Sequence, residues 1–134
     1  MKRGSAYWIN LEPSSPPERG KVRPGIVVSN SIQNQRLDSV VIVPLSSRAP
    51  EIWPLRFRLE LPGMKASYAV IPGIRRVSKS RLEDFIAETA AEAMARIGNA
   101  LAIYLGDGSR PPAAASRVSG GRRGRALEAT IPAG

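Results

Sequence analysis

Six consecutive residues, Val40–Leu45, constrain the fold of this chain more than any other segment. They are apolar without alternation, which is typical of a strand buried on both faces. A second apolar segment, 22–29, comes before them, and the polar stretch 31–37 separates the two. We therefore expect 40–45 to be a central strand, 22–29 to be a second strand and 31–37 to be a loop.

Alternation of apolar and polar residues indicates further strands. It predicts half-buried strands at 5–11 and 55–61, and the second of these has one charged face. Short strands are expected at 67–71 and 74–77, broken by Pro72-Gly73, and a last strand follows a turn containing Lys79 and Arg81. The segment 13–20 contains three prolines, which remove ladder donors, and is expected to be a mobile loop.

One helix is predicted near the end of this pattern. Thr89 and Glu92 have the spacing of a capping box. Four apolar residues then recur at helical spacing before Gly106, a residue typical of a helix stop: Met94, Ile97, Leu101 and Leu105. Short strands followed by one helix at about 90–105 predict a mainly β (α+β) fold, in which the helix packs on a strongly bent antiparallel sheet or partly open barrel.

The formal net charge is +9 over 134 residues, and the excess is not confined to the end of the chain. Residues 1–106, which we take as one domain, carry +6, and 107–134 carry +3. A basic compact domain favours a polyanion or an acidic protein as partner, although the excess also serves solubility. Residues 107–134 have no apolar period and are expected to be a disordered basic tail. That tail either adds nucleic-acid affinity, is inert or is a remnant of cloning.

Two residue types are missing from the sequence. It has no cysteine, which excludes disulfides and thiolate metal sites and is compatible with a reducing cytoplasm. It has no histidine, which removes the usual general base and the commonest nitrogen ligand of metals. No apolar run reaches the roughly 18 residues that span a bilayer, and no signal-peptide core follows the N-terminus. We expect a cytoplasmic protein without a membrane segment.

Arg23 stands at the mouth of the second strand, and Ser46 and Ser47 stand at the end of the central strand. A guanidinium presents several fixed donors to phosphate oxygens, and hydroxyl groups add more. This combination predicts a phosphate-handling site.

The order and spacing of short motifs over residues 2–106 resemble the MazF/PemK toxins. The motifs are Arg3-Gly4, Asn10-Leu11-Glu12-Pro13, Glu18-x-Gly20-Lys21-x-Arg23-Pro24, Ser29-Asn30, Val43-Pro44-Leu45-Ser46-Ser47, Ile74-Arg75, Lys79-Ser80-Arg81-Leu82 and Leu105-Gly106. The resemblance implies an SH3-like barrel of the CcdB/MazF type with a C-terminal helix, acting as a homodimer. It also implies a sequence-specific endoribonuclease (mRNA interferase) that cleaves single-stranded RNA with no metal or other cofactor, and that a cognate antitoxin inhibits.

The resemblance also implies roles for single residues. Arg23 matches the family's catalytic arginine, although an ion pair with Glu12 or Glu18 is the alternative. Ser46 stands where the family commonly has a catalytic threonine; its alternative is a hydroxyl that ends a strand by bonding the backbone. The residues expected to bind RNA are Glu18, Arg19, Lys21, Ser47, Arg75 and Arg76. Trp8, Trp53 and Tyr68 either stack on bases or pack in the core or an interface.

The chain departs from the family pattern at Ser5, Pro72, Gly73, Arg76 and Ser78. The change at 72–73 removes side chains that would touch RNA, so an altered base preference or weakened activity is expected. Two other functions therefore stay open. One is a non-catalytic toxin or antitoxin-binding protein on the same fold, as in the CcdB poisons of DNA gyrase, and the other is a basic RNA-binding domain without a toxin role.

Overall fold

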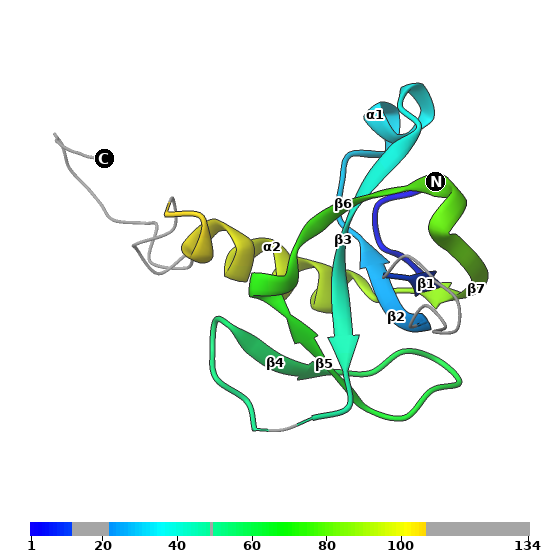
Figure 1. Cartoon of the computed structure of the whole chain (residues 1–134). Helices are drawn as coiled ribbons and strands as arrows, with labels where there is room; N and C mark the ends of the chain where they lie inside the picture. Colours follow the sequence, from blue (N-terminus) through cyan, green and yellow to red (C-terminus); the bar gives the residue numbers. More distant parts are fainter. Residues whose placement is uncertain (12–21, 49, 107–134) are drawn as a thin grey trace, which may run out of the picture.

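The computed structural model describes residues 1–11, 22–48 and 50–106. In chain order its elements are β1 (Ser5–Asn10), β2 (Val22–Val27), α1 (Ser31–Arg36), β3 (Ser39–Ser46), β4 (Arg56–Leu59), β5 (Ser67–Val70), the 3-10 helix η1 (Ile71–Gly73), β6 (Arg75–Ser78), the 3-10 helix η2 (Lys79–Arg81), β7 (Leu82–Glu88) and α2 (Ala91–Tyr104). Figure 1 shows the strands curling round β3, with α2 crossing behind β3 and β6 in that view.

All pairings in the sheet are antiparallel, and the strand order is β4-β5-β3-β2-β1-β7, with β6 paired to β3 as well. β3 is therefore the hub: β2 lies along one side of it, and β5 and β6 share the other. Within the described residues β4 and β7 do not pair, so the bent sheet is an open barrel and not a closed one. The expected mainly β architecture with a C-terminal helix is confirmed.

The sheet separates two apolar clusters. One face carries a compact cluster of five buried residues, which are Ile9, Val27, Val40, Ile42 and Val77. The other face carries the larger cluster, in which Val43 and Leu45 of β3 pack with Phe57 of β4 and with Ile97 and Ala100 of α2. The prediction that β3 is buried on both faces is confirmed, because alternate residues of this strand enter the two clusters.

The expected loop at 31–37 is wrong, because residues Ser31–Arg36 form α1. The Asn30 side chain accepts hydrogen bonds from the backbone N–H groups of Ile32 (2.7 Å) and Gln33 (3.3 Å), which caps the helix. Asn34 is buried, and its amide donates to the carbonyls of Met1 and Ser29, both at 3.1 Å. These six residues, of which only Ile32 is apolar, form a helix because a cap and a buried amide replace an apolar stripe.

The expected capping box at the start of α2 is also wrong. Ala90 is the N-cap residue and makes no side-chain cap bond. The Thr89 hydroxyl is buried without a hydrogen-bond partner, and the Thr89 N–H donates to the Gly4 carbonyl at 2.8 Å. Thr89 therefore continues the contacts of β7 with the N-terminal segment and does not cap the helix.

The predicted apolar stripe of α2 is confirmed for three of its four residues. Met94, Ile97 and Leu101 contact the larger cluster. Leu105 is 67% exposed, because it follows the last turn of the helix and does not face the core. Gly106 adopts φ +90°, which suits the predicted helix stop.

The turn before the last strand is formed by η2, as expected. Arg81 of η2 donates to the Asn10 carbonyl at 3.2 Å and so ties this turn to β1. The predicted loop at 13–20 and the predicted tail at 107–134 lie outside the described residues.

Candidate functional site

The register between β2 and β3 relates Arg23 to Ser46. Gly25 pairs with Pro44 and Val27 pairs with Ile42. Arg23 lies two residues before Gly25 on β2, and Ser46 lies two residues after Pro44 on β3, so each side chain points to the same side of the sheet as that pair. Residues opposite each other in an antiparallel pair share a face of the sheet, so both side chains belong to the face of the smaller apolar cluster.

The Ser46 hydroxyl ends β3 with a local hydrogen bond. Its oxygen accepts the backbone N–H of Arg48 at 3.1 Å. This is the backbone-bonding role that we gave as the alternative to a functional one. It leaves the hydroxyl hydrogen available, because a serine hydroxyl donates one bond while it accepts others. Ser46 is half-buried at the end of its strand and can therefore fill both roles.

Arg75 joins this face from the other side of β3. It starts β6 and pairs with Ile42. Because every second residue of a strand points to the same face, the Arg75 side chain lies on the face of Ile42, Pro44 and Ser46. Arg76 pairs with Val41, which packs against the larger cluster. The two neighbouring arginines are therefore directed to opposite faces, and only Arg75 shares the face of Arg23.

Gly25, Pro44 and Gly73 lack long side chains and lie close together near these residues, and we call them the floor of small residues. Gly25 pairs with Pro44, and a Cβ atom on Gly25 would lie 2.7 Å from Ile9 Cδ1. A Cβ atom on Gly73 would lie 2.7 Å from Pro44 Cγ. Any larger residue at either position requires movement of its neighbours. The departure at Gly73 therefore has a packing reason, because Pro44 occupies the space that a side chain at 73 would take.

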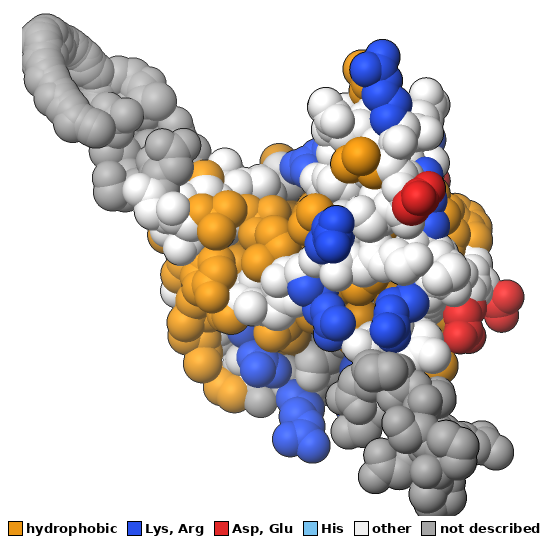
Figure 2. Space-filling model, turned by 45° about the horizontal axis from the view of Figure 1, so that its top comes forward, with side chains coloured by type: hydrophobic (Ala, Val, Ile, Leu, Met, Phe, Trp, Pro, Cys, Tyr) orange, Lys and Arg blue, Asp and Glu red, His pale blue; other side chains and the backbone are white. Residues whose placement is uncertain are grey.

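The exposed cations of this region are not engaged by carboxylates of the described residues. Within residues 1–11, 22–48 and 50–106 the only ion pair joins Arg58 to Glu60 (3.2 Å). Arg23, Arg75 and Arg76 are exposed. Figure 2 shows several Lys and Arg side chains on one face of the molecule with few acidic side chains among them.

Several predicted site residues lie outside the described residues, namely Glu18, Arg19 and Lys21, as does the Glu12 of the alternative ion pair. Ser47 is exposed and follows β3. It lies in the bend after the strand, so strand alternation places Ser46 on the face of Arg23 but does not place Ser47.

Two other departures from the family pattern have structural roles away from this site. The buried Ser5 hydroxyl donates to a Glu88 carboxylate oxygen at 2.9 Å, so an acidic residue at position 5 would repel Glu88. Ser78 is the N-cap residue of η2, where its oxygen accepts the Ser80 N–H at 3.3 Å. A serine in that position keeps the acceptor that an aspartate would supply.

The three aromatic residues named from the sequence separate in the structure. Tyr68 of β5 pairs directly with Ser46 and is only half-buried, which puts it beside the site. Trp53 packs on Phe57, with ring centroids 5.2 Å apart. Trp8 pairs with Pro24 and so has the parity of the face opposite Arg23.

Two arginines outside the predicted set are linked to Ser46, one directly and one through the other. Arg48 supplies the N–H that holds Ser46, and its carbonyl accepts a bond from the Arg56 guanidinium at 3.2 Å. Alternation had placed Arg56 on a wet strand face without any further role. Sequence spacing gave no signal for the contact between Arg56 and Arg48, because it joins β4 to the turn after β3 and does not follow the period of either strand.

Within the described part of the chain, no group of three acidic side chains is arranged to hold a metal ion. None of the described helices has the length and apolarity needed to cross a membrane.

Comparison with known proteins gives a consistent result. The family model described as PemK-like, MazF-like toxin of type II toxin-antitoxin system matches residues 2–105. The Endoribonuclease MazF of Staphylococcus saprophyticus is 26% identical over 114 residues, covering 79% of this chain and 92% of that protein.

Solved structures agree with the family model. An endoribonuclease from Mycobacterial species, in complex with its cognate antitoxin, is 26% identical with a TM-score of 0.68, covering 79% of this chain and 95% of that chain. MazF from Deinococcus radiodurans is 25% identical with a TM-score of 0.66, covering 79% and 96%. With a family model that spans most of its length and neighbours of the same fold, the chain belongs to the PemK-like, MazF-like toxins of type II toxin–antitoxin systems.

Proposed function

We propose that this chain is an endoribonuclease toxin that cleaves single-stranded mRNA at short sequences, without a metal ion, in the cytoplasm. The observation that carries the proposal is the placement of Arg23, Ser46 and Arg75 on one face of the sheet, around the floor of small residues. A phosphodiester needs several converging donors, and this face supplies them from three adjacent strands.

The chemistry that fits these residues uses the RNA's own 2′-hydroxyl. Its oxygen attacks the adjacent phosphorus, the bond to the 5′ oxygen breaks, and the products are a 2′,3′-cyclic phosphate and a 5′-hydroxyl. The 2′ proton must be accepted, the leaving 5′ oxygen must gain a proton, and the negative charge on the phosphorane must be stabilised.

Arg23 and Ser46 meet the third requirement. The Arg23 guanidinium donates to a phosphoryl oxygen, and the Ser46 hydroxyl adds a donor while its own oxygen accepts from Arg48. A guanidinium keeps its proton in proteins, so we assign Arg23 an electrostatic role. Glu18 is our candidate for accepting the 2′ proton or reading a base edge, and it remains a prediction from the sequence.

The remaining residues bind the RNA strand. We propose that Arg75 contacts backbone phosphates next to the scissile one and that Tyr68, across from Ser46, stacks on an unpaired base. We also propose RNA contacts for Arg19, Lys21, Ser47 and Arg76. The contact of Arg76 is the weakest of the set, because its side chain is directed to the face opposite Arg75.

We propose a homodimer and an inhibitory antitoxin. Large apolar side chains are exposed at the end of α2 and in the segment before β4: Tyr104 (42%), Leu105 (67%), Ile52 (52%) and Trp53 (48%). Figure 2 shows a broad hydrophobic region on the side where α2 ends. A patch of this kind on a small domain fits a subunit interface. An acidic antitoxin segment would complement the face of Arg23 and Arg75.

The function is tested by incubating the purified protein with a long single-stranded RNA in EDTA and analysing the ends produced. We expect fragments with 2′,3′-cyclic phosphate and 5′-hydroxyl ends, which disappear in Arg23→Ala. Sequencing the 5′ ends gives the recognised sequence. Intact RNA together with inhibition of DNA gyrase would instead support a CcdB-like poison. Salt-sensitive RNA binding without cleavage would support a degenerate binding protein.

The antitoxin placement has a separate test. Hydrogen exchange of the complex should show protection in residues 13–24 and 44–48. Protection confined to other parts of the chain would show that the antitoxin binds elsewhere.

A further inference from the structure

The turn that follows β3 is held by a relay of two hydrogen bonds. The Arg56 guanidinium donates to the Arg48 carbonyl at 3.2 Å, and the Arg48 N–H donates to the Ser46 hydroxyl oxygen at 3.1 Å. Arg56 starts from a fixed backbone, because its N–H donates to Ile52 (2.8 Å) and its carbonyl accepts from Ile52 (2.7 Å). Its side chain therefore crosses from β4 to the end of β3.

This relay restrains the Ser46 hydroxyl. A serine lacks the branched Cβ that limits the χ1 rotamers of threonine, so its hydroxyl is less restricted by its own covalent structure. The bond from the Arg48 N–H supplies the missing restraint by fixing one acceptor direction of the oxygen. The hydroxyl hydrogen is then directed away from the peptide, where it can meet a bound phosphate.

We propose that Arg56 is a positioning residue for Ser46. It orients the Arg48 peptide, and that peptide orients the hydroxyl that donates to the scissile phosphate. The inference rests on the proposed RNA cleavage, and it adds a residue that touches neither the RNA nor the reacting atoms. Arg56 belongs to the edge strand β4, which is three strands away from β2, the strand of Arg23, in the order β4-β5-β3-β2.

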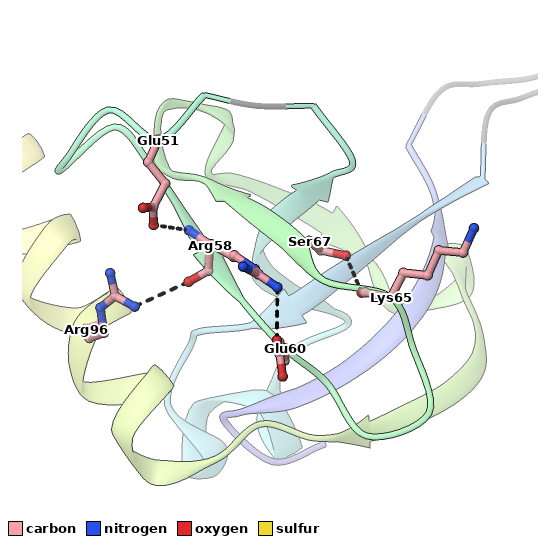
Figure 3. Close-up of polar contacts among 6 residues, drawn as sticks. All are labelled: Glu51, Arg58, Glu60, Lys65, Ser67 and Arg96. Carbon is pink, nitrogen blue, oxygen red and sulfur yellow. Dashed lines mark hydrogen bonds and ion pairs between the residues drawn. The ribbon is translucent and has the colours of Figure 1, made fainter.

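The same strand offers a matched control. Arg58 lies two residues further along β4, and its side chain pairs with Glu60 at 3.2 Å in an exposed contact (Figure 3). No hydrogen bond joins Arg58 to Arg48 in the described residues. Arg58→Ala removes the same charge and the same side-chain length from the same strand without touching the relay.

The experiment compares single-turnover cleavage at saturating protein for six proteins: wild type, Arg56→Ala, Arg56→Lys, Arg58→Ala, Ser46→Ala and the Arg56→Ala/Ser46→Ala double variant. The substrate is a short RNA with one cleavage site mapped with the wild-type protein. Apparent Kd is measured over a range of salt concentrations. Protection of the Arg48 amide against hydrogen exchange is measured by NMR.

We expect Arg56→Ala to slow cleavage about 10-fold, which corresponds to losing one charge-assisted hydrogen bond. Apparent Kd and its salt slope should stay at the wild-type values. Arg56→Lys should recover part of the rate, because an ammonium group also donates. Arg58→Ala should cleave like wild type. In the Ser46→Ala background, Arg56→Ala should cause no further loss, since both changes remove the same contribution.

Three results would overturn the inference. One is an Arg56→Ala rate equal to that of Arg58→Ala. Another is the full 10-fold loss persisting in the Ser46→Ala background. The last is weaker binding with a smaller salt slope, which would mean a direct phosphate contact. If the wild-type protein does not cleave RNA, the proposed function is overturned instead. In that case the hydrogen-exchange measurement still tests the relay, and unchanged protection of the Arg48 amide in Arg56→Ala would overturn it.

Discussion

The edge strand β4 and the face of Arg23 both carry arginines, but the fold uses them differently. On β4 each outward backbone group of Arg56 and Arg58 has a partner. The Arg56 N–H donates to the Ile52 carbonyl, and the Arg56 carbonyl accepts from the Ile52 N–H. The Arg58 N–H donates to Glu51 at 2.7 Å, and the Arg58 carbonyl accepts from Arg96 at 3.3 Å, as Figure 3 shows. This edge is closed to a further strand, which protects it from edge-to-edge pairing.

The other region is open. Arg23 and Arg75 are exposed and share a face with the Ser46 hydroxyl and a floor of residues that lack long side chains. The Arg56 guanidinium bonds the Arg48 carbonyl and that of Arg96 lies on aromatic rings, whereas Arg23 and Arg75 lie where a polyanion can reach them. Charge alone therefore does not distinguish these two groups of arginines, whereas their hydrogen-bond and ring partners do.

The largest effect is expected at the open face. Arg23→Ala should lower the cleavage rate about 10²–10³-fold, because one preorganised donor to the phosphorane is lost. The free energy of unfolding should change by no more than about 0.5 kcal/mol, since the side chain is exposed. Rates come from single-turnover assays and stability from urea denaturation. A rate loss accompanied by a matching loss of stability would mean that Arg23 is structural.

Much of the fold followed from sequence patterns, because they report burial directly. Val40–Leu45 entered both apolar clusters, and Met94, Ile97 and Leu101 packed as their spacing indicated. The two wrong predictions, the loop at 31–37 and the capping box at Thr89, both concern helix caps. A cap depends on where a side chain meets backbone groups, as at Asn30, or on a competing bond, as from the Thr89 N–H to Gly4. The periodic pattern of apolar residues does not reveal such hydrogen-bond partners.

The candidate site residues remain predictions, and the structure adds how the strands arrange them. The Arg23 and Ser46 candidates rested on residue type and on family resemblance, and the β2–β3 register relates them to one face. Arg76 stays a prediction, and it is directed to the face opposite Arg75 because neighbouring strand residues alternate between faces. The contact of Arg56 with Arg48 joins β4 to the turn after β3, so no periodicity within a strand predicts it.

An effect on stability of about 1–2 kcal/mol is expected at the β4 edge. The Arg96 guanidinium lies 4.5 Å from the Phe57 ring centroid and 5.8 Å from that of Trp53, and it also bonds the Arg58 carbonyl. Arg96→Ala removes these cation–π contacts and that hydrogen bond. Chemical denaturation should show the loss, while the cleavage rate of the folded protein stays unchanged. A slower rate with wild-type stability would assign Arg96 to the open face.

A smaller effect is expected on RNA binding. Arg75→Ala should weaken binding and reduce the slope of log K against log salt by about 0.7, the value for one phosphate contact on a single strand. Arg76→Ala should change the slope less, because Arg76 has the opposite parity along β6. Fluorescence anisotropy over a range of salt concentrations measures both slopes. Equal slopes for the two variants would show that strand parity does not decide which cation meets RNA.

The smallest effect is expected at the exposed ion pair. Arg58→Ala breaks the contact with Glu60, in which both side chains are more than half exposed (56% and 69%). Surface pairs of this kind contribute about 0–1 kcal/mol, so stability and cleavage should both remain near wild type. Thermal and urea denaturation provide the check. A loss above about 2 kcal/mol would mean that the β4 edge depends on this pair more than its exposure indicates.

The most direct test of the central claim, that Arg23 and Ser46 converge on one phosphate, is NMR with a short RNA containing a single 2′-deoxynucleotide at the cleavage site. The analogue binds but cannot be cut, because it lacks the attacking hydroxyl. The Nε–H signals of Arg23 and Arg75 and the amide signals of 46–48 should shift together, while those of Arg58 and Arg96 stay in place. Shifts at Arg58 and Arg96 with no change at Arg23 would contradict the account.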